Sequence, residues 1–266
     1  MPRKRVFVML LAVLLVASAA YWLLGLKQWS GKQIDHQSLA DGIELTIGSF
    51  QHPDSESVTV TVVKSRPKQI ELLIDFDNLE KASEQQDFIA SANRQDAVAM
   101  INGGYFDASF QPVGLVVKDI ETISEMSNQP ALSGVLAVFD SKSVLLIPRS
   151  SYLPDNGIRS AIQAGPFLVD PGGKQGIRSD DLKKAKRTAI GQTISGDIVF
   201  ISTTPCTLYE LSEILTKHQN VLSVERFESV LNLDGGPSTG LYLQGLDEYH
   251  VVPETDVPNR ILMLKR

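Results

Sequence analysis

The chain has 266 residues, of which 43% are hydrophobic and 21% are charged, a composition that allows one large domain or two small ones with a sizeable core. Its formal net charge is −6, and the four basic residues among the first 27 leave the remaining chain at −10. General nucleic-acid binding requires a basic surface, so we expect no nucleic-acid partner for this acidic body.

The first 27 residues have the pattern of an export signal. Arg3-Lys4-Arg5 precedes an uncharged apolar run over residues 6–26, which Lys27 ends. The run is long enough to cross a bilayer, whereas Ala17-Ser18-Ala19 suits a signal-peptide cleavage site. A retained membrane anchor and a cleaved signal peptide are both open. Either one exports the rest of the chain to a periplasmic or extracellular location.

After this segment, residues 28–40 are polar and weakly patterned, so we expect a linker there and a single domain over residues 41–266. Alternation of apolar and polar residues, bounded by turn residues, predicts many strands in that domain. The predicted strands lie at residues 43–50, 58–63, 70–76, 97–101, 113–117, 134–139, 144–147, 188–193, 198–202, 230–233, 240–243 and 260–264, with a further apolar stretch at 161–169.

Two segments have the pattern of amphipathic helices. Residues 79–92 are rich in Glu, Gln, Ala and Lys, and residues 208–218 place four apolar side chains on one face. Thr207, with Glu210 three residues later, matches a capping box at the start of the second helix. Two or three helices among so many strands predict an α+β fold with a strand-rich mixed sheet core.

Three short segments share one chemical style, in which polar residues stand beside glycines at the ends of apolar strands. A Gly-Gly step has no Cβ atoms, so its amides can approach a ligand closely and adopt positive φ. Functional groups often lie on such loops at strand ends, so we expect a polar, anion-tolerant site here. The segments are Asn102-Gly103-Gly104-Tyr105-Phe106, Arg187-Thr188-Ala189-Ile190-Gly191 and Asn232-Leu233-Asp234-Gly235-Gly236-Pro237-Ser238-Thr239.

Asp234 is the first candidate for a reactive group, because it follows an apolar strand and precedes two glycines. A carboxylate there can act as a base, a nucleophile or a metal ligand, although Asp-Gly is also a common hairpin turn. Ser238 and Thr239 add hydrogen-bond donors just beyond the glycines, and such a turn can bind an anion.

The other candidates supply recognition. Asn102 has a neutral amide that can donate to one ligand oxygen and accept from another group. Arg187 and Arg260 each begin an apolar strand, and a guanidinium matches a phosphate or carboxylate in bidentate fashion. Asp107 suits a solvated turn, and Cys206, the only cysteine, suits a small buried residue. The four histidines are scattered, which disfavours a zinc site.

In their order, the Asn102, Arg187 and Asp234 segments resemble the motifs of the phosphodiester glycosidase family, which has lysosomal and bacterial envelope members. The resemblance covers about residues 40–266, and an Arg260 strand closes the chain. Pro237 stands where the family usually has another glycine, and Gln192 stands where some members have histidine.

This resemblance implies hydrolysis of a glycosyl-1-phosphodiester at the anomeric carbon of the sugar, on envelope or exported glycans. Ordinary glycosidases protonate a poor alcohol leaving group with a carboxylic acid. A phosphate monoester leaves more readily, since its second pKa is about 6, so an arginine can take the place of that acid. We therefore expect Arg187 to bind phosphate and Asp234 to act as base or nucleophile. Asn102, Gly103, Gly104, Asn232, Gly235, Gly236, Ser238, Thr239 and Arg260 are expected to bind the substrate.

Two other functions fit the same residues. A metal-dependent phosphodiesterase would place Asp234, Asp107 and Asn232 around a Mg²⁺ or Ca²⁺ ion. A non-catalytic protein would bind envelope polysaccharide at a degenerate site. Analysis of the products formed from glycosyl phosphodiesters would separate the three functions.

Overall fold

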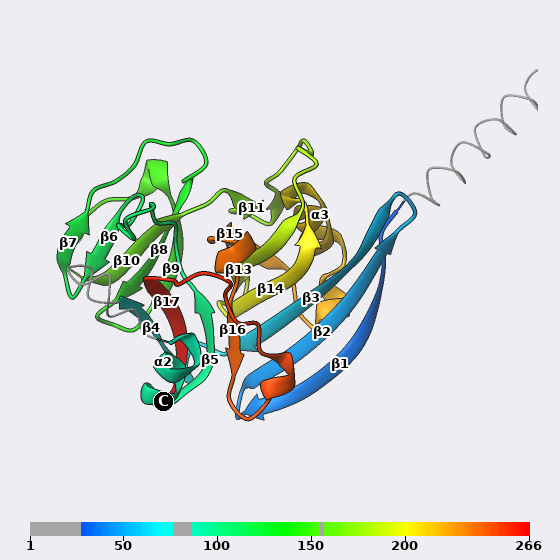
Figure 1. Cartoon of the computed structure of the whole chain (residues 1–266), viewed down its shortest axis with the longest axis horizontal. Coiled ribbons are helices and arrows are strands. Elements are labelled where there is room, and N and C mark those ends of the chain that lie inside the picture. The colour runs from blue at the N-terminus through cyan, green and yellow to red at the C-terminus, as the bar shows by residue number, and fades with distance from the viewer. Residues whose placement is uncertain (1–27, 77–86, 155–156) are drawn as a thin grey trace, which may run out of the picture.

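The structure, a computed structural model, describes residues 28–76, 87–154 and 157–266 (Figure 1). The predicted export signal over residues 1–27 and most of the predicted helix over residues 79–92 lie outside these ranges. Within these ranges, none of the helices has the length and apolar character needed to span a membrane.

All strand pairings between the described strands are antiparallel, and the strands form three sheets in place of the expected mixed sheet (Figure 1). The largest sheet has eight strands in the order β1-β2-β3-β14-β13-β15-β11-β12. Their bounds are β1 Ser30–Ala40, β2 Ile43–His52, β3 Ser55–Ser65, β14 Ile198–Cys206, β13 Ala185–Thr193, β15 Phe227–Asn232, β11 Phe167–Asp170 and β12 Lys174–Gln175.

The two smaller sheets have five and four strands, in the orders β7-β6-β10-β8-β9 and β16-β5-β17-β4. The strands of the five-stranded sheet are β7 Glu121–Ser124, β6 Val116–Lys118, β10 Ile158–Ala164, β8 Gly134–Phe139 and β9 Val144–Pro148. Those of the four-stranded sheet are β16 Leu241–Leu243, β5 Ala97–Asn102, β17 Asn259–Lys265 and β4 Ile70–Phe76.

One apolar core joins the three sheets, because each sheet turns one face of alternating side chains toward it. Leu45 and Phe200 come from the eight-stranded sheet, Leu136 from the five-stranded sheet, and Ile101 and Ile261 from the four-stranded sheet. Burial of these side chains removes apolar area from water, which stabilises the fold by about 25 cal/mol per Å² of buried area. This shared core fixes how the sheets meet, and with that the position of the loops between them.

The described helices cover outer faces of the sheets. Helix α3 (Leu208–Lys217) packs Leu211, Ile214 and Leu215 onto the eight-stranded sheet, and α2 (Phe88–Arg94) covers the four-stranded sheet. The predicted capping box at Thr207 and Glu210 is confirmed. Four short 3-10 turns complete the described elements, η2 Arg149–Ser151, η3 Gln219–Leu222, η4 Gly236–Ser238 and η5 Asp247–Tyr249.

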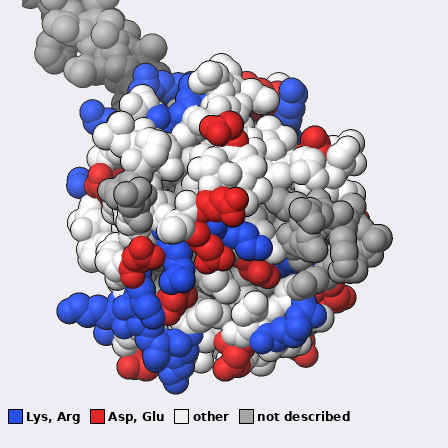
Figure 2. Space-filling view, turned by 90° about the vertical axis from the view of Figure 1, so that its left-hand side faces the viewer, with Lys and Arg blue, Asp and Glu red and all other residues white. Residues whose placement is uncertain are grey.

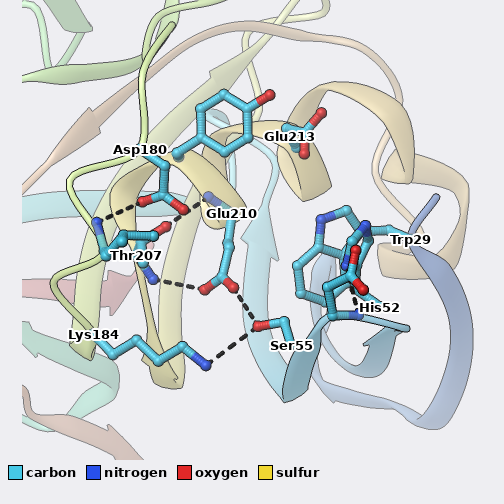
Figure 3. A pocket seen from close by; sticks show the side chains of 11 residues that line it. Trp29, His52, Ser55, Asp180, Lys184, Thr207, Glu210 and Glu213 are labelled. Carbon is cyan, nitrogen blue, oxygen red and sulfur yellow. Dashed lines mark hydrogen bonds between the residues drawn. The ribbon is translucent and has the colours of Figure 1, made fainter. Parts of the chain in front are cut away.

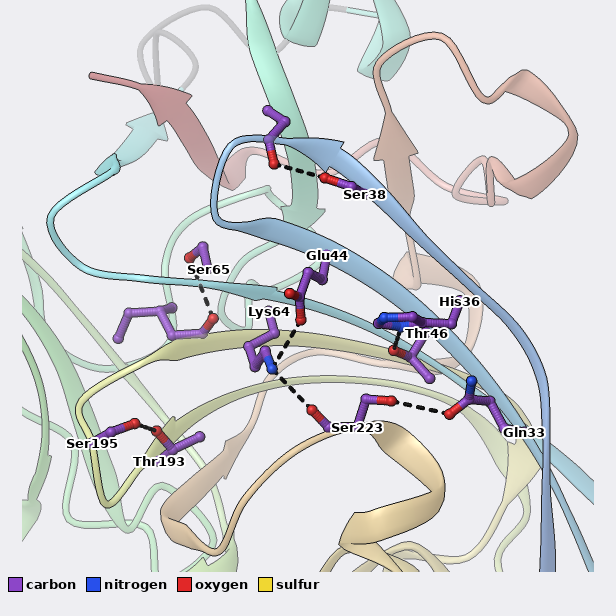
Figure 4. A network of polar contacts seen from close by, with 12 residues as sticks. Gln33, His36, Ser38, Glu44, Thr46, Lys64, Ser65, Thr193, Ser195 and Ser223 are labelled. Atoms are coloured by element: carbon purple, nitrogen blue, oxygen red, sulfur yellow. Dashed lines mark hydrogen bonds and ion pairs between the residues drawn. The ribbon is translucent and has the colours of Figure 1, made fainter.

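The strand-rich core with two helices confirms the α+β class in outline, and most predicted strands are present at close to their expected bounds. The linker predicted over residues 28–40 is wrong, because residues 30–40 form β1, which pairs with β2 over its length. Most of the side chains of β1 are exposed, and the strand is held by its backbone and by polar contacts. His36 Nδ1 lies 2.8 Å from Thr46 Oγ1, and Ser223 Oγ donates to Gln33 Oε1 at 3.0 Å (Figure 4). A polar strand at a sheet edge has no apolar alternation to reveal it in the sequence.

On the face of the molecule that Figure 2 shows, charged side chains of both signs lie mostly in the lower half, and Lys and Arg gather at the lower left. Arg159 pairs with Asp119 at 3.7 Å, and Lys142 pairs with Glu71. Exposed pairs of this kind contribute little to stability, about 0–1 kcal/mol each.

Candidate active site

The three motif segments meet where the eight-stranded sheet joins the four-stranded sheet. The amide of Asp234, just beyond β15, donates to the carbonyl of Gly103, just beyond β5, at 3.1 Å. The amide of Leu233 donates to the carbonyl of Thr188 on β13 at 2.9 Å. Segments that lie far apart in the chain therefore form one loop cluster, as expected from their shared style.

Asn102 is the side chain that ties this cluster together. Its Nδ2 donates to the carbonyl of Asp234 at 2.8 Å, and its Oδ1 accepts from Thr188 Oγ1 at 2.7 Å and from the amide of Gly240 at 3.0 Å. Only 1% of the residue is exposed. Both acceptor positions of its amide are used within the protein, so Asn102 positions the Asp234 loop. A direct contact of Asn102 with substrate stays a prediction.

A second buried amide, Asn232, is fixed by Tyr105 and Gly165. Asn232 Nδ2 donates to Tyr105 Oη at 2.7 Å and to the carbonyl of Leu233 at 2.8 Å, and Tyr105 Oη donates to the carbonyl of Gly165 at 2.7 Å. Among the described residues, Asn232 Oδ1 and Thr239 Oγ1 are buried atoms with no hydrogen-bond partner. A buried acceptor without a partner is costly, so these two atoms are suited to meet a polar ligand.

Asp234 has a perturbed carboxyl group. Burial raises its pKa above the ordinary value, while hydrogen bonds from Ser238 and from the amide of Gly235, at 2.9 Å, oppose that rise. The same environment shifts the pKa of Tyr105, because burial and the charge of Asp234 raise it to about 12. The Asn232 hydrogen bond and the charge of Arg187 act in the opposite direction on Tyr105. Asp234, Tyr105 and Arg187 thus share one electrostatic environment, as is common at functional sites.

Tyr105 is the site residue that reasoning from the sequence did not select. Its position beside Phe106 suggests core packing, and Phe106 does pack against the cluster under α2. The two side chains differ because Tyr105 directs its hydroxyl to Asn232 and Gly165. The signal in the sequence was the hydroxyl itself, since a partly buried tyrosine usually has a hydrogen-bond partner.

Gly103 and Gly104 lie in close contact with neighbouring side chains. A Cβ atom at Gly103 would lie 2.0 Å from Asn259 Oδ1, and one at Gly104 would lie 2.9 Å from the side chain of Ile162. The amide of Gly104 donates to that same Asn259 oxygen at 2.7 Å. Gly103 and Gly104 therefore permit close packing of the protein on itself, and the expected approach of a ligand to this pair stays a prediction.

In the loop after Asp234, one of the two glycines has the positive φ that is predicted for these residues. Gly236 has φ of 58°, and a Cβ atom added there would have no neighbour within 4 Å, whereas one added at Gly235 would lie 2.9 Å from the carbonyl oxygen of Lys186. Pro237 lies in the first turn of η4, where its missing amide proton is not needed. The proline is thus compatible with this loop and stabilises the turn that carries Ser238.

Arg187 lies beside this loop on β13 and is half-buried. Its Nε donates to the carbonyl of Cys206 at 3.0 Å, and its Nη2 donates to the carbonyl of Lys183. Its Cδ would lie 3.8 Å from a Cβ atom at Gly235. A guanidinium has five N–H groups, so these two bonds orient Arg187 and leave other N–H groups for an anion.

Arg260 lies beside the loop cluster on β17, whereas Asp107 lies in an exposed turn. Arg260 pairs with Asn102 in the β5–β17 register but is only 1% exposed, so a contact with substrate stays a prediction. The carboxylate of Asp107 accepts from the amides of Ser109 and Gln111, at 2.8 and 3.0 Å, in an exposed turn as expected. In the described part of the chain, no cluster of three or more His, Cys, Asp or Glu residues is arranged to hold a metal ion.

Cys206 is fully buried, and burial raises the pKa of its thiol to about 11. The thiolate is therefore scarce at neutral pH, which is the property of a structural cysteine.

Comparison with known proteins places these residues in a family. The family model for phosphodiester glycosidases matches residues 95–263, which contain all three motif segments. A search of curated proteins by sequence finds no match.

Solved structures share the fold. The catalytic domain of zebrafish N-acetylglucosamine-1-phosphodiester alpha-N-acetylglucosaminidase, auto-inhibited by its pro-peptide, aligns with a TM-score of 0.62 at 14% identity, covering 90% of this chain and 88% of that one. A protein from Synechocystis aligns with a TM-score of 0.61 at 18% identity, covering 87% of this chain and 64% of that one. A protein from Burkholderia pseudomallei gives a TM-score of 0.55 at 14% identity, covering 78% and 74%.

Proposed function

Because the chain belongs to the phosphodiester glycosidase family, we propose that it hydrolyses a glycosyl-1-phosphodiester at the anomeric carbon of the sugar. The name of the zebrafish relative describes the same class of bond. We propose exported or envelope glycans as the source of the substrate, since residues 1–27 have the pattern of an export signal.

The observation that carries the proposal is the placement of Asp234 where the two sheets meet. Its backbone is held by Gly103 and Asn102, while its carboxyl group has a pKa raised by burial. A raised pKa makes the ionised carboxylate a stronger base. Such a group can activate water or attack the anomeric carbon, and both roles are open for Asp234.

Arg187 supplies the second part of the proposed mechanism. Cleavage at the anomeric carbon breaks the bond between that carbon and the phosphate oxygen, so the leaving group is a phosphate monoester. Its second pKa is about 6, so it departs as an anion without prior protonation at neutral pH. A guanidinium already oriented by two carbonyl groups stabilises the charge that develops on the phosphate.

The remaining polar groups are proposed to bind the sugar. Asn232 Oδ1 accepts from a sugar hydroxyl, and Thr239 Oγ1 contributes a second polar contact from the far side of the Asp234 loop. Ser238 already bonds to Asp234 and so sets the orientation of its carboxylate.

The test is turnover of a panel of glycosyl-1-phosphodiesters with identification of both products. Free sugar with a phosphomonoester is the expected result, and sugar-1-phosphate would contradict the proposal because it reports cleavage on the other side of phosphorus. A reaction that stops in chelator and returns with Mg²⁺ or Ca²⁺ would favour the metal-dependent phosphodiesterase. Glycan binding without turnover would favour a non-catalytic protein.

A further inference from the structure

A cavity of about 550 Å³ lies between the hairpin of β2 and β3, the start of α3 and the segment before β13 (Figure 3). Its volume is in the range of about 300–1,000 Å³ that is typical of small-molecule sites. Trp29 and His52 stand on one side of it, and Asp180, Thr207 and Lys184 stand on the other (Figure 3). The cavity is separate from the Asp234 loop, because none of its lining residues belongs to that loop.

The side chain of Arg187 lies between the Asp234 loop and the segments that line this cavity. Its stem lies beside Gly235, next to Asp234. Its guanidinium donates to the carbonyls of Cys206 and Lys183, whose sequence neighbours Thr207 and Lys184 line the cavity. The phosphate site proposed at Arg187 therefore lies between the Asp234 loop and the segments that line the cavity.

The charge of the lining selects against a second anion. Asp54, Asp180, Glu210 and Glu213 supply four carboxylates, whereas Lys184 is the only lysine or arginine in the lining. Lys184 is itself paired with Glu56 at 3.6 Å. Carboxylates repel a phosphate and attract a cation, and the attraction is stronger in a partly closed cavity than in bulk water.

The start of α3 does not reverse this preference. The carboxylate of Glu210 already lies at the helix N-terminus, because in the capping box Glu210 accepts from the Thr207 amide at 2.8 Å and Thr207 Oγ1 accepts from the Glu210 amide at 3.1 Å, so a second anion there would be repelled. Glu210 also accepts from Ser55, so it is fixed in place (Figure 3). Glu213 is paired with Lys217, so the remaining carboxylates of the lining are those of Asp54 and Asp180, and of these two Asp180 lies in the loop before β13.

Aromatic side chains complete the lining. Trp29 is 7% exposed and packs against His52 with a distance of 5.2 Å between ring centroids, and Tyr209 lines the cavity from α3. Aromatic faces attract ammonium groups and also pack against the C–H face of a sugar ring. Carboxylates together with aromatic rings thus match a polar ligand that carries a protonated amine.

We propose that this cavity binds the leaving arm of the phosphodiester and selects an arm that carries a protonated amine, from an amino sugar or an amino alcohol. The proposal rests on the proposed function in that Arg187 binds the phosphate between the two arms. It adds a substrate class, because the preferred substrate is a zwitterionic phosphodiester.

The test compares full-length protein on substrates that share the same glycosyl-1-phosphate and differ in the leaving arm. The arms are glucosamine, N-acetylglucosamine, ethanolamine and glycerol. We expect kcat/KM to be about tenfold higher for an amine-bearing arm than for its neutral counterpart, since one charge pair in a partly closed site is of that order. The glucosamine and ethanolamine arms show which source of amine the cavity prefers. Equal kcat/KM for amine-bearing and neutral arms would overturn the proposal.

Variants of the lining residues test whether the cavity selects the leaving arm independently of catalysis. Asp180→Asn keeps the acceptor that bonds to the Leu182 amide at 3.0 Å but removes the charge, so the ratio of kcat/KM for the amine-bearing arm to kcat/KM for its neutral counterpart should fall severalfold. Glu121→Gln, an equal charge change on β7 of the five-stranded sheet, should leave the preference intact. If both variants behave alike, the cavity has no part in selection.

Binding to the Asp234→Asn variant distinguishes failure of this proposal from failure of the proposed function. Calorimetry of that variant with the glucosamine and N-acetylglucosamine substrates should show tighter binding of the amine. A preference in binding without turnover by the unaltered protein would support the cavity and refute the hydrolase. Equal affinities, or binding of neither substrate, would refute the cavity.

Discussion

Tyr105→Phe is the change that most directly tests whether the Tyr105–Asn232 contact organises the site. It removes one hydroxyl that accepts from Asn232 Nδ2 and donates to the Gly165 carbonyl, both at 2.7 Å. Asn232 keeps its bond to Leu233 at 2.8 Å, and Gly165 keeps a longer contact with Asn232 at 3.3 Å, so neither group is left wholly without a partner. The expected loss of stability is about 1–3 kcal/mol.

Chemical unfolding in urea measures that loss, and Tyr242→Phe is the matched control. The hydroxyl of Tyr242 donates to Asn93 Oδ1 at 2.8 Å, away from the three motif segments, and the residue is 5% exposed. Both variants should lose stability, but only Tyr105→Phe should lower kcat, by about tenfold or more, because Asn232 is then free to turn. Unchanged kcat in Tyr105→Phe, or an equal fall in Tyr242→Phe, would refute the reasoning.

The effect of pH on Tyr105 gives a second readout from the same pair of proteins. The folded-state pKa of about 12 exceeds the ordinary value of 10.0, so the folded protein retains the proton more tightly than the unfolded chain. The resulting stability is fully present below about pH 10 and is lost as pH rises toward 12. The stability difference between the unaltered protein and Tyr105→Phe should therefore shrink across that interval.

Three further substitutions test the site from other directions. Asp234→Asn should abolish turnover and yet stabilise the protein at pH 7 but not below pH 3.8. A carboxyl group whose pKa is raised by burial loses its stabilising contribution as pH rises, and the variant removes that loss. Equal thermal midpoints of variant and parent at pH 7 would contradict this prediction. Arg187→Lys should lower kcat/KM by about 100-fold in steady-state turnover, since lysine cannot keep the bonds to Cys206 and Lys183 while it faces phosphate. Full activity of this variant would exclude Arg187 from the reaction. Gly103→Ala should destabilise the protein by about 1–3 kcal/mol in urea unfolding, because the added Cβ would lie 2.0 Å from Asn259 Oδ1, and a neutral result would mean that Asn259 moves away freely.

The sequence predicted those parts of the fold in which one face of a strand or helix is buried. The strand at 70–76 and the capped helix after Thr207 both have a clear period, and both are present as expected. Strand β1 has most of its side chains in water, so its sequence carries no such period. The division into three sheets depends on which strands pair over long distances in the chain, and local pattern does not encode that pairing.

In the candidate site, local sequence pattern likewise does not encode the role of each single residue. The motif segments do lie together, since Asn102 bonds to the carbonyl of Asp234. They did not distinguish a residue that holds the loop from one that faces a ligand, since Asn102 is chemically suited to both tasks. Only the bonds to Thr188 and Gly240 assign Asn102 to the first, just as the bonds of Tyr105 separate it from Phe106.

The order of strands in the four-stranded sheet has a consequence for biosynthesis. β17, the last strand in chain order, lies between β5 and β4, and its first residue, Asn259, bonds to the amides of Gly103 and Gly104. The bond to Gly104 joins residues 155 positions apart, so the loop that carries Asn102 is completed only after β17 has emerged and inserted between its neighbours. A chain in which β17 has not yet inserted therefore lacks a completed site, and any activity begins with the insertion of this strand.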